Sequence, residues 1–181
     1  ETGMPVFPTD PAPAVLPWAR MPVHPFDTEV VHISSHTGTH MDAPSHFVRG
    51  AAAIDGVDLA SCLSPGALLD LRSLAPVGTI DPSDLRDAEA RSVRCLSQGD
   101  AVLLWTGWSR RWRHRDYVAS YPGLSEDGAR YLVERGASVV GIDTPNVDHP
   151  SAGDFPAHRA LLSAGIPIVE NLTRLGTIRS S

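Results

Sequence analysis

The stretch AHRALLSAGIPIVE, residues 157–170, predicts a short helix that leads directly into a strand. The helix is expected over residues 157–164, and Gly165 supplies the turn that ends it. The apolar run over residues 166–170 is typical of a strand. Since a helix rises about 1.5 Å per residue and a strand about 3.3 Å, the strand can return to the start of the helix. His158 and Glu170 can therefore face one site. The alternative for this segment alone is that Glu170 is exposed at the end of the strand and His158 caps its helix.

The same alternation of strand and helix extends upstream. Branched apolar runs between Gly and Pro predict strands at residues 30–34, 67–71, 101–105 and 138–142. Helices are expected to begin at Asp81-Pro82 and at Ser125, because each start combines a capping residue with acidic residues in the first turn. The pattern predicts an α/β fold in one domain over residues 1–181. The sequence opens within a motif-like segment and stops a few residues after an expected strand, so one or more terminal strands are expected beyond it.

Composition narrows the class of protein. The chain is 42% hydrophobic and 20% charged, with a formal net charge of -6, which is typical of one globular domain and argues against nucleic-acid binding. The two cysteines lack CxxC spacing, so neither a thiolate zinc site nor a disulfide scaffold is indicated. No apolar run is long enough to span a membrane, and the first residues do not resemble a signal peptide. The expected location is the cytoplasm.

The segment HTGTHMDAPSHF, residues 36–47, carries an unusual density of metal-binding side chains: His36, His40, Asp42 and His46. A straight strand would place the first and third of these about 20 Å apart, whereas ligands of one ion lie about 2 Å from it. The chain must therefore curl, with Gly38 admitting a positive φ and Pro44 fixing a turn and barring a helix. For a single histidine, a surface position in a polar loop is the simpler explanation. The combined spacing favours a zinc or manganese site.

These two segments resemble the cyclase family, which includes the bacterial kynurenine formamidases. The signature His-x-Gly-Thr-His-x-Asp-x-Pro-x-His-Phe is present without departure, and the similarity continues in MPVFPTDP, LLWTGWS, YPGLS, GIDTPNVD and AHRALLSAGIPIVENL. The resemblance implies a swivelling β/β/α fold, with a mixed sheet and flanking helices, and a metal-dependent amide hydrolase. It also implies a homodimer or homotetramer.

The resemblance also implies roles for individual residues. His36, His40 and Asp42 correspond to ligands of one divalent ion, Asp42 and Glu170 to ligands shared between two ions, and His158 to a ligand of the second. His46 corresponds to the residue that transfers protons. One or two ions are expected, with zinc or manganese as the metal.

Substrate contacts are expected from aromatic residues. Phe7 matches a position that contacts substrate in the family. Trp105 stands where the family has arginine, which points to a different specificity, and Trp108 is a further candidate for the pocket wall. Core packing is the alternative for about half of the aromatic residues. Asp143 and Asp148 are expected to orient histidines or fix a loop, because such contacts are common around metals.

The predicted function is hydrolysis of an amide bond, of the arylformamide or lactam type, by metal-activated water with His46 as general acid and base. The partner is then a small-molecule substrate, with no nucleic acid or membrane. Two alternatives stay open at this stage. One is a biosynthetic cyclase or dehydratase on the same scaffold, and the other is a non-catalytic metal-binding protein.

Overall fold

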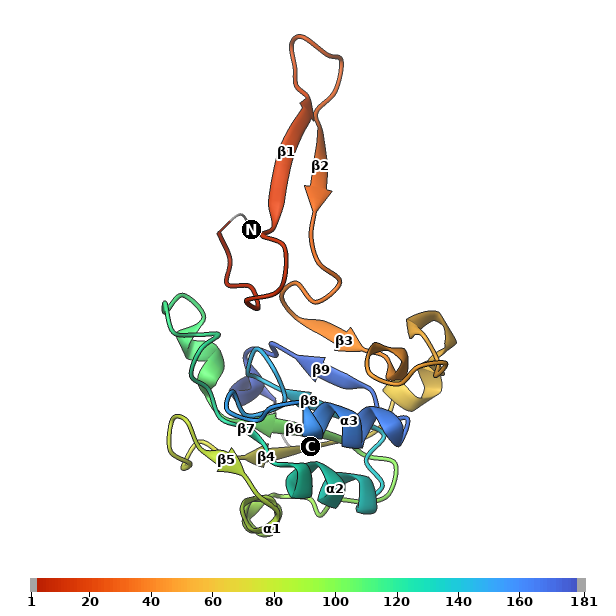
Figure 1. Cartoon of the computed structure of the whole chain (residues 1–181), viewed down its shortest axis with the longest axis vertical. Coiled ribbons are helices and arrows are strands. Elements are labelled where there is room, and N and C mark those ends of the chain that lie inside the picture. Colours follow the sequence, from red (N-terminus) through yellow and green to blue (C-terminus); the bar gives the residue numbers. More distant parts are fainter. Residues whose placement is uncertain (1–2, 179–181) are drawn as a thin grey trace.

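The computed structural model describes residues 3–178 and shows an α/β body built on a mixed sheet of five strands (Figure 1). The predicted α/β class and the mixed sheet with flanking helices are confirmed. The strands follow the spatial order β3-β9-β8-β6-β4. Their bounds are His40–Asp42 for β3, Ile168–Glu170 for β9, Val139–Ile142 for β8, Ala101–Trp105 for β6 and Gly66–Asp70 for β4.

The direction of the strands gives the sheet its mixed character. β4, β6, β8 and β9 run parallel, and β3 lies antiparallel to β9 at one edge. In the β3 to β9 register, His40 lies opposite Glu170 and Asp42 lies opposite Ile168. This pairing brings the histidine segment against the last strand of the sheet.

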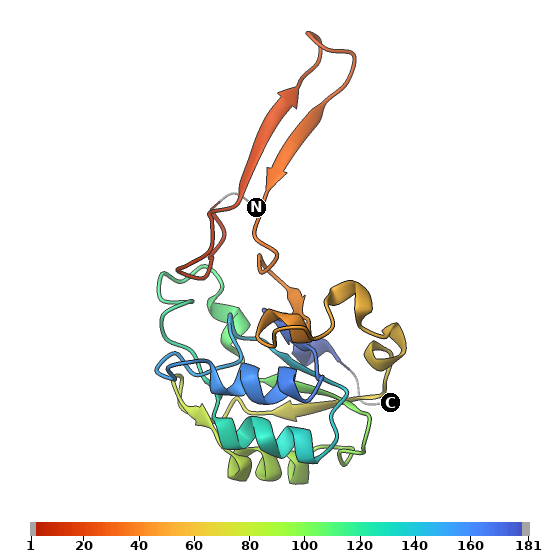
Figure 2. The same cartoon turned by 45° about the vertical axis from the view of Figure 1, so that its right-hand side comes forward.

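Three α-helices flank the sheet: α1 (Pro82–Arg91), α2 (Glu126–Glu134) and α3 (Pro156–Ser163) (Figures 1 and 2). Their starts follow the predicted capping chemistry. Asp81 and Asp84 form a capping box at α1, and the Ser125 side chain accepts a hydrogen bond of 3.0 Å from the Gly128 N–H at α2. None of the helices in the described part of the chain is long and apolar enough to cross a membrane.

The core lies between the sheet and the helices. Leu104 and Ile142 from the sheet and Leu85, Leu132 and Leu161 from the three helices are completely buried. Burying each such side chain stabilises the fold by about 1.5–3 kcal/mol. This packing fixes β8, β9 and α3, which carry the C-terminal part of the site.

A small second sheet anchors a loop beside the site. It pairs β5 (Thr79–Ile80) with β7 (Gly123–Leu124), and Leu124 forms an isolated bridge with Asp148. The backbone of Gly123 lies so close to this loop that an added Cβ would stand 2.3 Å from the His149 nitrogen. The position of Asp148 therefore depends on this close approach.

Short 3-10 turns complete the body: η1 (Pro44–His46), η2 (Ile54–Gly56), η3 (Leu59–Cys62), η4 (Trp108–Arg111) and η5 (Leu175–Thr177). Pro44 fixes a turn as expected, and this turn is the short 3-10 turn η1. Proline is tolerated at the first helical position, where its missing N–H needs no partner, and Pro44 begins η1.

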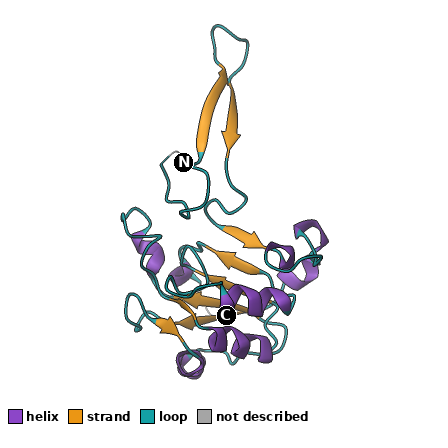
Figure 3. Ribbon diagram, in the orientation of Figure 1, coloured by secondary structure: helices purple, strands orange, loops and turns teal. Residues whose placement is uncertain are grey.

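A two-stranded hairpin stands away from the body (Figures 1 and 3). It pairs β1 (Ala14–Ala19) with β2 (Thr28–His32) in antiparallel register. The sequence predicted a strand near β2 but none at β1. Pro13 and Pro17 hide β1, because proline inside a run argues against a strand and is tolerated only at an edge.

Candidate metal centre

The register of β3 against β9 builds one side of the site. His40 and Asp42 are on β3, and Glu170 ends β9. His40 Nε2 lies 3.3 Å from Asp42 Oδ1 and 3.7 Å from Glu170 Oε2. The other ring nitrogen of His40, Nδ1, lies 2.9 Å from the Gly38 carbonyl oxygen, which orients Nε2 toward the carboxylates.

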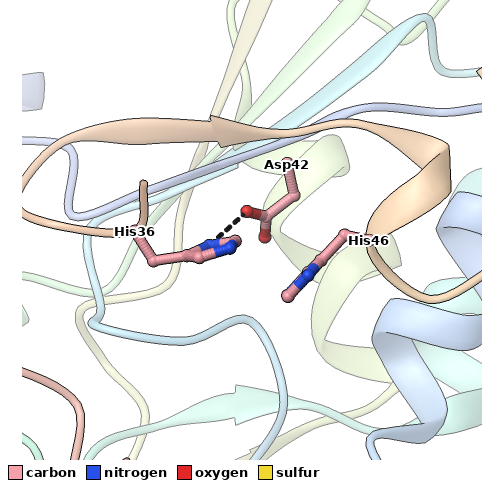
Figure 4. Close-up of side chains that lie close together, drawn as sticks. All are labelled: His36, Asp42 and His46. Carbon is pink, nitrogen blue, oxygen red and sulfur yellow. Dashed lines mark ion pairs between the residues drawn. The ribbon is translucent and has the colours of Figure 1, made fainter. Parts of the chain in front are cut away.

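The curl before β3 brings His36 back to the same point. Gly38 has a φ of +71°, a conformation that favours glycine. His36 Nδ1 then lies 2.9 Å from Asp42 Oδ1, and the ring of His46 lies 4.2 Å from that of His36, centroid to centroid. Figure 4 shows these three side chains converging from β3 and the segments on either side of it. The chain thus curls as the sequence predicted.

His158 closes the site from α3. Its Nε2 lies 3.3 Å from both Asp42 Oδ2 and Glu170 Oε1. Its Nδ1 lies 2.5 Å from Asp148 Oδ2, and Asp148 also accepts hydrogen bonds from the backbone N–H groups of Ala157 and His158. Asp148 therefore orients the imidazole, as the sequence predicted for one of two carboxylates.

The second of those carboxylates has a different task. Asp143 accepts hydrogen bonds from the backbone N–H groups of Thr106 and Gly107 and from the hydroxyl groups of Thr106 and Ser109. It is completely buried. Asp143 thus fixes the loop after β6, which was the other role predicted for these carboxylates.

The donor atoms fit a divalent cation. Among the described residues, both carboxylate oxygens of Asp42 and Nε2 of His40 are buried without a hydrogen-bond partner. Burying polar atoms without a hydrogen bond costs free energy. Because these atoms lie close together, one positive charge shared between them would stabilise the site. Two groups of ligand atoms, each within 4.8 Å, meet at Asp42: one with His36 and His46, the other with His40 and Glu170. Nitrogen and oxygen donors without sulfur suit zinc or manganese.

The pKa shifts of Asp42 and His158 also indicate a site that attracts positive charge. Burial opposes the charged form of Asp42, but the imidazoles of His158, His36 and His40 outweigh it and hold the pKa of Asp42 far below its ordinary value. Burial also opposes the charged form of His158, yet Asp148, Asp42 and Glu170 raise its pKa well above 6.5. The clustered carboxylates thus attract positive charge, whether carried by protons or by a metal ion.

A cavity of about 250 Å³ opens over these residues. Its wall includes all six of the predicted metal-site and proton-transfer residues and also Phe7, the predicted substrate contact. Phe47 and Phe155 add apolar surface, and Asp10, Asn146 and Asn171 add polar groups. Sequence analysis did not single out these five residues. The loop before β1 contributes Phe7 and Asp10 to the same cavity wall as the histidine segment.

Two predicted substrate contacts lie elsewhere. Trp108 is buried against Tyr117, whose backbone oxygen accepts a hydrogen bond from the indole Nε1. Trp105 packs under the Arg72 guanidinium, 3.7 Å from its ring centroid, and lines a separate depression with η5. Neither residue lines the cavity over the histidines. Trp108 therefore follows the core-packing alternative, whereas Trp105 is half-buried and lines a depression of its own.

Comparison with known proteins places the chain in a family. The Cyclase family model, described as "Putative cyclase", matches residues 1–149. The chain is 32% identical over 176 residues to a kynurenine formamidase of Bordetella petrii, covering 95% of this chain and 78% of that protein. It is 31% identical to a kynurenine formamidase of Polaromonas naphthalenivorans, covering 92% and 70% respectively. The chain belongs to the cyclase family.

Solved structures agree with this placement. A structure titled as a potential metal-dependent hydrolase with cyclase activity matches with a TM-score of 0.78 and 28% identity, over 99% of this chain and 80% of that one. Isatin hydrolase A from Ralstonia solanacearum shares the fold, with a TM-score of 0.88 at 21% identity, over 99% and 78%. The fold and the metal dependence of such relatives agree with the donor set described above.

Proposed function

We propose that this chain is a metal-dependent hydrolase that cleaves a carbon–nitrogen bond of the arylformamide or lactam type. One observation carries the proposal. The carboxylate oxygens of Asp42 are buried without a hydrogen-bond partner, and they lie beside the imidazoles of His40 on β3 and His158 on α3 in the wall of a cavity. The relatives named kynurenine formamidase, together with the structural relative titled as a metal-dependent hydrolase, support amide hydrolysis as the reaction.

The proposed ligands divide into two groups. His36, His40 and Asp42 would hold one ion, and His158 would hold a second together with Asp42 and Glu170. A single ion among the same side chains remains compatible with the distances. Zinc is our first candidate and manganese the second. A divalent ion held there supplies Lewis acidity, which acidifies water and polarises a carbonyl oxygen.

His46 is the proposed proton-transfer residue. It lies at the exposed side of the cavity, and partial burial, together with the neighbouring His36, His158 and His40, lowers its pKa despite the opposing charge of Asp42. Its imidazole is therefore neutral at pH 7 and can accept a proton from water. The resulting imidazolium can donate that proton to the leaving nitrogen.

The cavity wall supports a small substrate with an aromatic ring. Phe7, Phe47 and Phe155 offer ring surfaces for stacking, and the volume of about 250 Å³ lies just below the ~300–1,000 Å³ of usual ligand sites, which suits a small ligand. Asn146 and Asn171 also line the cavity. Their Oδ1 atoms accept hydrogen bonds from the Asp148 N–H and the Tyr117 hydroxyl, so their Nδ2 groups are left to donate to a polar substituent. An N-formyl aryl amine combines these features.

The test combines metal analysis with hydrolysis assays. Protein stripped of metal and reloaded with zinc or manganese should hydrolyse N-formyl aryl amines or small lactams, releasing carboxylate and amine. Protein that binds neither ion would overturn the metal site. Protein that binds an ion but leaves all of these amides intact would overturn hydrolysis and favour a cyclase or dehydratase.

The role of His46 is tested separately. His46→Ala should lower kcat by about 10²–10⁴, the usual contribution of a positioned acid or base. Its metal content should stay near that of the wild type. His114→Ala is the matched control, because His114 is exposed and pairs with Asp116 outside the cavity. Full turnover in His46→Ala with the metal retained would remove the proposed role.

A further inference from the structure

The turn that leads into α3 has a strained backbone. Asp154 has a φ of +66°, and Phe155 has a φ of +50° with a ψ of +57°, so two successive residues other than glycine adopt the left-handed conformation. Bulky side chains such as phenylalanine rarely adopt this conformation. Phe155 also precedes Pro156, whose ring favours an extended conformation for the residue before it. Strain of this kind persists only where other contacts hold it, and it clusters at sites that bind ligands.

The ring of Phe155 lies in the wall of the cavity over the histidines. Its centroid is 5.3 Å from that of Phe47 and 5.9 Å from that of His158, and its plane is perpendicular to the His158 ring. Phe47 packs against the hydrophobic core, whereas Phe155 is half-buried and, in the described part of the chain, belongs to neither core cluster. The strain is therefore not a by-product of core packing. It places an aromatic ring beside a proposed metal ligand.

Arg159 holds the strained turn. Its Nε donates a hydrogen bond of 2.8 Å to the Asp154 carbonyl oxygen, and its guanidinium lies 2.9 Å from Asp154 Oδ1. The backbone N–H of Arg159 donates to the Phe155 carbonyl oxygen at 3.0 Å. The same guanidinium lies 5.7 Å from the ring centroid of Phe47. Because Arg159 contacts the residue before Phe155, Phe155 itself and the ring beside it, Arg159 fixes the direction of the Phe155 side chain.

We propose that Phe155 is a specificity-determining residue, which selects a flat aromatic group over a saturated ring of similar size. A ring that is fixed in direction offers a flat surface, and contact between aromatic rings is favourable beyond the area that it buries. A saturated ring is thicker and gains no such contact. In a cavity of about 250 Å³, the added thickness is hard to accommodate. Asp154 and Arg159 act as positioning residues for the ring.

This selectivity deepens the proposed function and rests on it for the reaction that follows binding. The preference itself is a property of the cavity wall, so ligands that do not react can measure it. Acetophenone and cyclohexyl methyl ketone are suitable probes. Both are neutral, have a similar size and carry a carbonyl group, but neither has a nitrogen that could leave. They differ in whether the ring is flat or saturated.

Titration of the protein with both ketones, followed by NMR or calorimetry, tests the proposal. The wild type should bind acetophenone more tightly than cyclohexyl methyl ketone by about 2–10-fold, the usual benefit of a contact between two aromatic rings. Phe155→Leu keeps an apolar side chain but removes the flat ring, so it should bind the two ketones with similar affinity. Phe26→Leu is the matched control, because Phe26 is exposed between β1 and β2, and it should keep the wild-type preference.

Arg159→Gln tests the positioning role. This variant keeps the Phe155 ring but removes the guanidinium that contacts Asp154, so its preference for acetophenone should fall toward that of Phe155→Leu. Arg130→Gln is the matched control, since Arg130 forms an exposed pair with Glu126 on α2 outside the cavity. It should keep the wild-type preference. An unchanged preference in Arg159→Gln would overturn the positioning role of Arg159.

Thermal unfolding measures the strain itself. Phe155→Gly and Phe155→Ala both remove the ring, but only glycine adopts the left-handed conformation freely. The glycine variant should therefore have the higher Tm, by about 2–4 °C, whereas at an ordinary position glycine is the less stable of the two. Both variants should also lose the preference for acetophenone. A residue that merely begins α3 would not show this combination.

Three results would overturn the role of Phe155. They are equal affinity of the wild type for the two ketones, a wild-type preference retained in Phe155→Leu, and an alanine variant more stable than the glycine variant. None of them depends on hydrolysis. Wild-type protein that prefers acetophenone but cleaves no amide would overturn the proposed function alone. Wild-type protein that hydrolyses N-formylaniline without a preference between the ketones would overturn only the role of Phe155.

Discussion

Asp148 illustrates how the site depends on a side chain outside its predicted donor set. Its carboxylate receives the Nδ1 side of His158 and two backbone N–H groups at the start of α3. It therefore fixes both the ring orientation of His158 and the end of the helix that carries it. From sequence, Asp148 was only one of two carboxylates with this possible role, because a GIDTPNVD motif does not reveal which of them reaches a histidine.

Asp148→Asn tests this dependence. The neutral amide is a weaker acceptor for the imidazole, so affinity for zinc should fall by about 10–100-fold, the usual effect of losing such an orienting partner. Calorimetric titration of the metal-free protein measures the change. Asp154→Asn is the control, since Asp154 has an 85% exposed side chain that pairs with Arg159 instead. Equal affinities in the two variants would show that Asp148 does not orient a ligand.

At the scale of elements, five of the described strands and the three described α-helices were predicted well, whereas β1, β3, β5 and β7 and the pairing of the strands were not. The expected strands became β2, β4, β6, β8 and β9 with shifts of at most two residues at either end, and the expected helices became α1, α2 and α3. Apolar runs and capping residues are local signals, so one sequence reveals them. The register of β3 on β9 and the small sheet of β5 and β7 depend on distant contacts, and no local pattern encodes them.

Gly123→Ala tests the contact between β7 and the loop that carries Asp148. The new Cβ would stand 2.3 Å from the His149 nitrogen and 2.4 Å from the Asp148 carbonyl carbon, so the loop must move. Overpacking of this kind costs about 1–3 kcal/mol. Thermal unfolding should show that loss, and zinc affinity should fall with it. Gly153→Ala, which meets no atom within 4 Å, should change neither quantity.

The stability of the contact between α1 and α2 depends on pH through the carboxyl group of Glu89 on α1. It accepts hydrogen bonds from the Tyr131 hydroxyl, the Leu96 N–H and the Arg135 guanidinium. Burial opposes ionisation of Glu89, but these contacts outweigh it and lower its pKa below 4.5. A lowered pKa stabilises the fold above the unfolded value, and that stability is lost as the pH falls through the folded value.

Glu89→Gln should therefore lower the free energy of unfolding at pH 7 by about 1–2 kcal/mol, because hydrogen bonds to a charged group are lost. The difference from wild type should shrink as the pH falls below about 4.5. Urea unfolding across pH 3–8 measures both. Glu126→Gln is the control, since its pair with Arg130 is exposed and such pairs contribute about 0.3–0.5 kcal/mol. A pH-independent difference would contradict the assignment to ionised Glu89.

For the whole molecule, sequence analysis predicted which candidate ligands come together but not the shape of their surroundings. His36, His40, Asp42, His46, His158 and Glu170 all reach one cavity, as their spacing and the family signature predicted. Trp105 and Trp108 do not, because aromatic content says nothing about the direction in which a side chain points. The projecting hairpin was also missed, since its prolines obscure the strand pattern.

Metal removal should change the stability of the whole body. An ion that binds only the folded chain stabilises it by about 2.7 kcal/mol at a free concentration one hundred times its Kd. Chelation should therefore lower Tm, and added zinc should restore it. In Asp42→Asn, whose substitution removes the carboxylate shared by the proposed ligand groups, zinc should have little effect on Tm. An equal shift in that variant would place the ion elsewhere.

The pairing of β3 with β9 has a consequence for biosynthesis. Thr39 and Asn171, which are hydrogen-bonded beside this pairing, are 132 residues apart in sequence. A ribosome must therefore translate past position 170 before the early histidines can meet their final carboxylate. An ion held by both the early histidines and Glu170 would therefore be bound only after this last strand has been synthesised and has paired with β3.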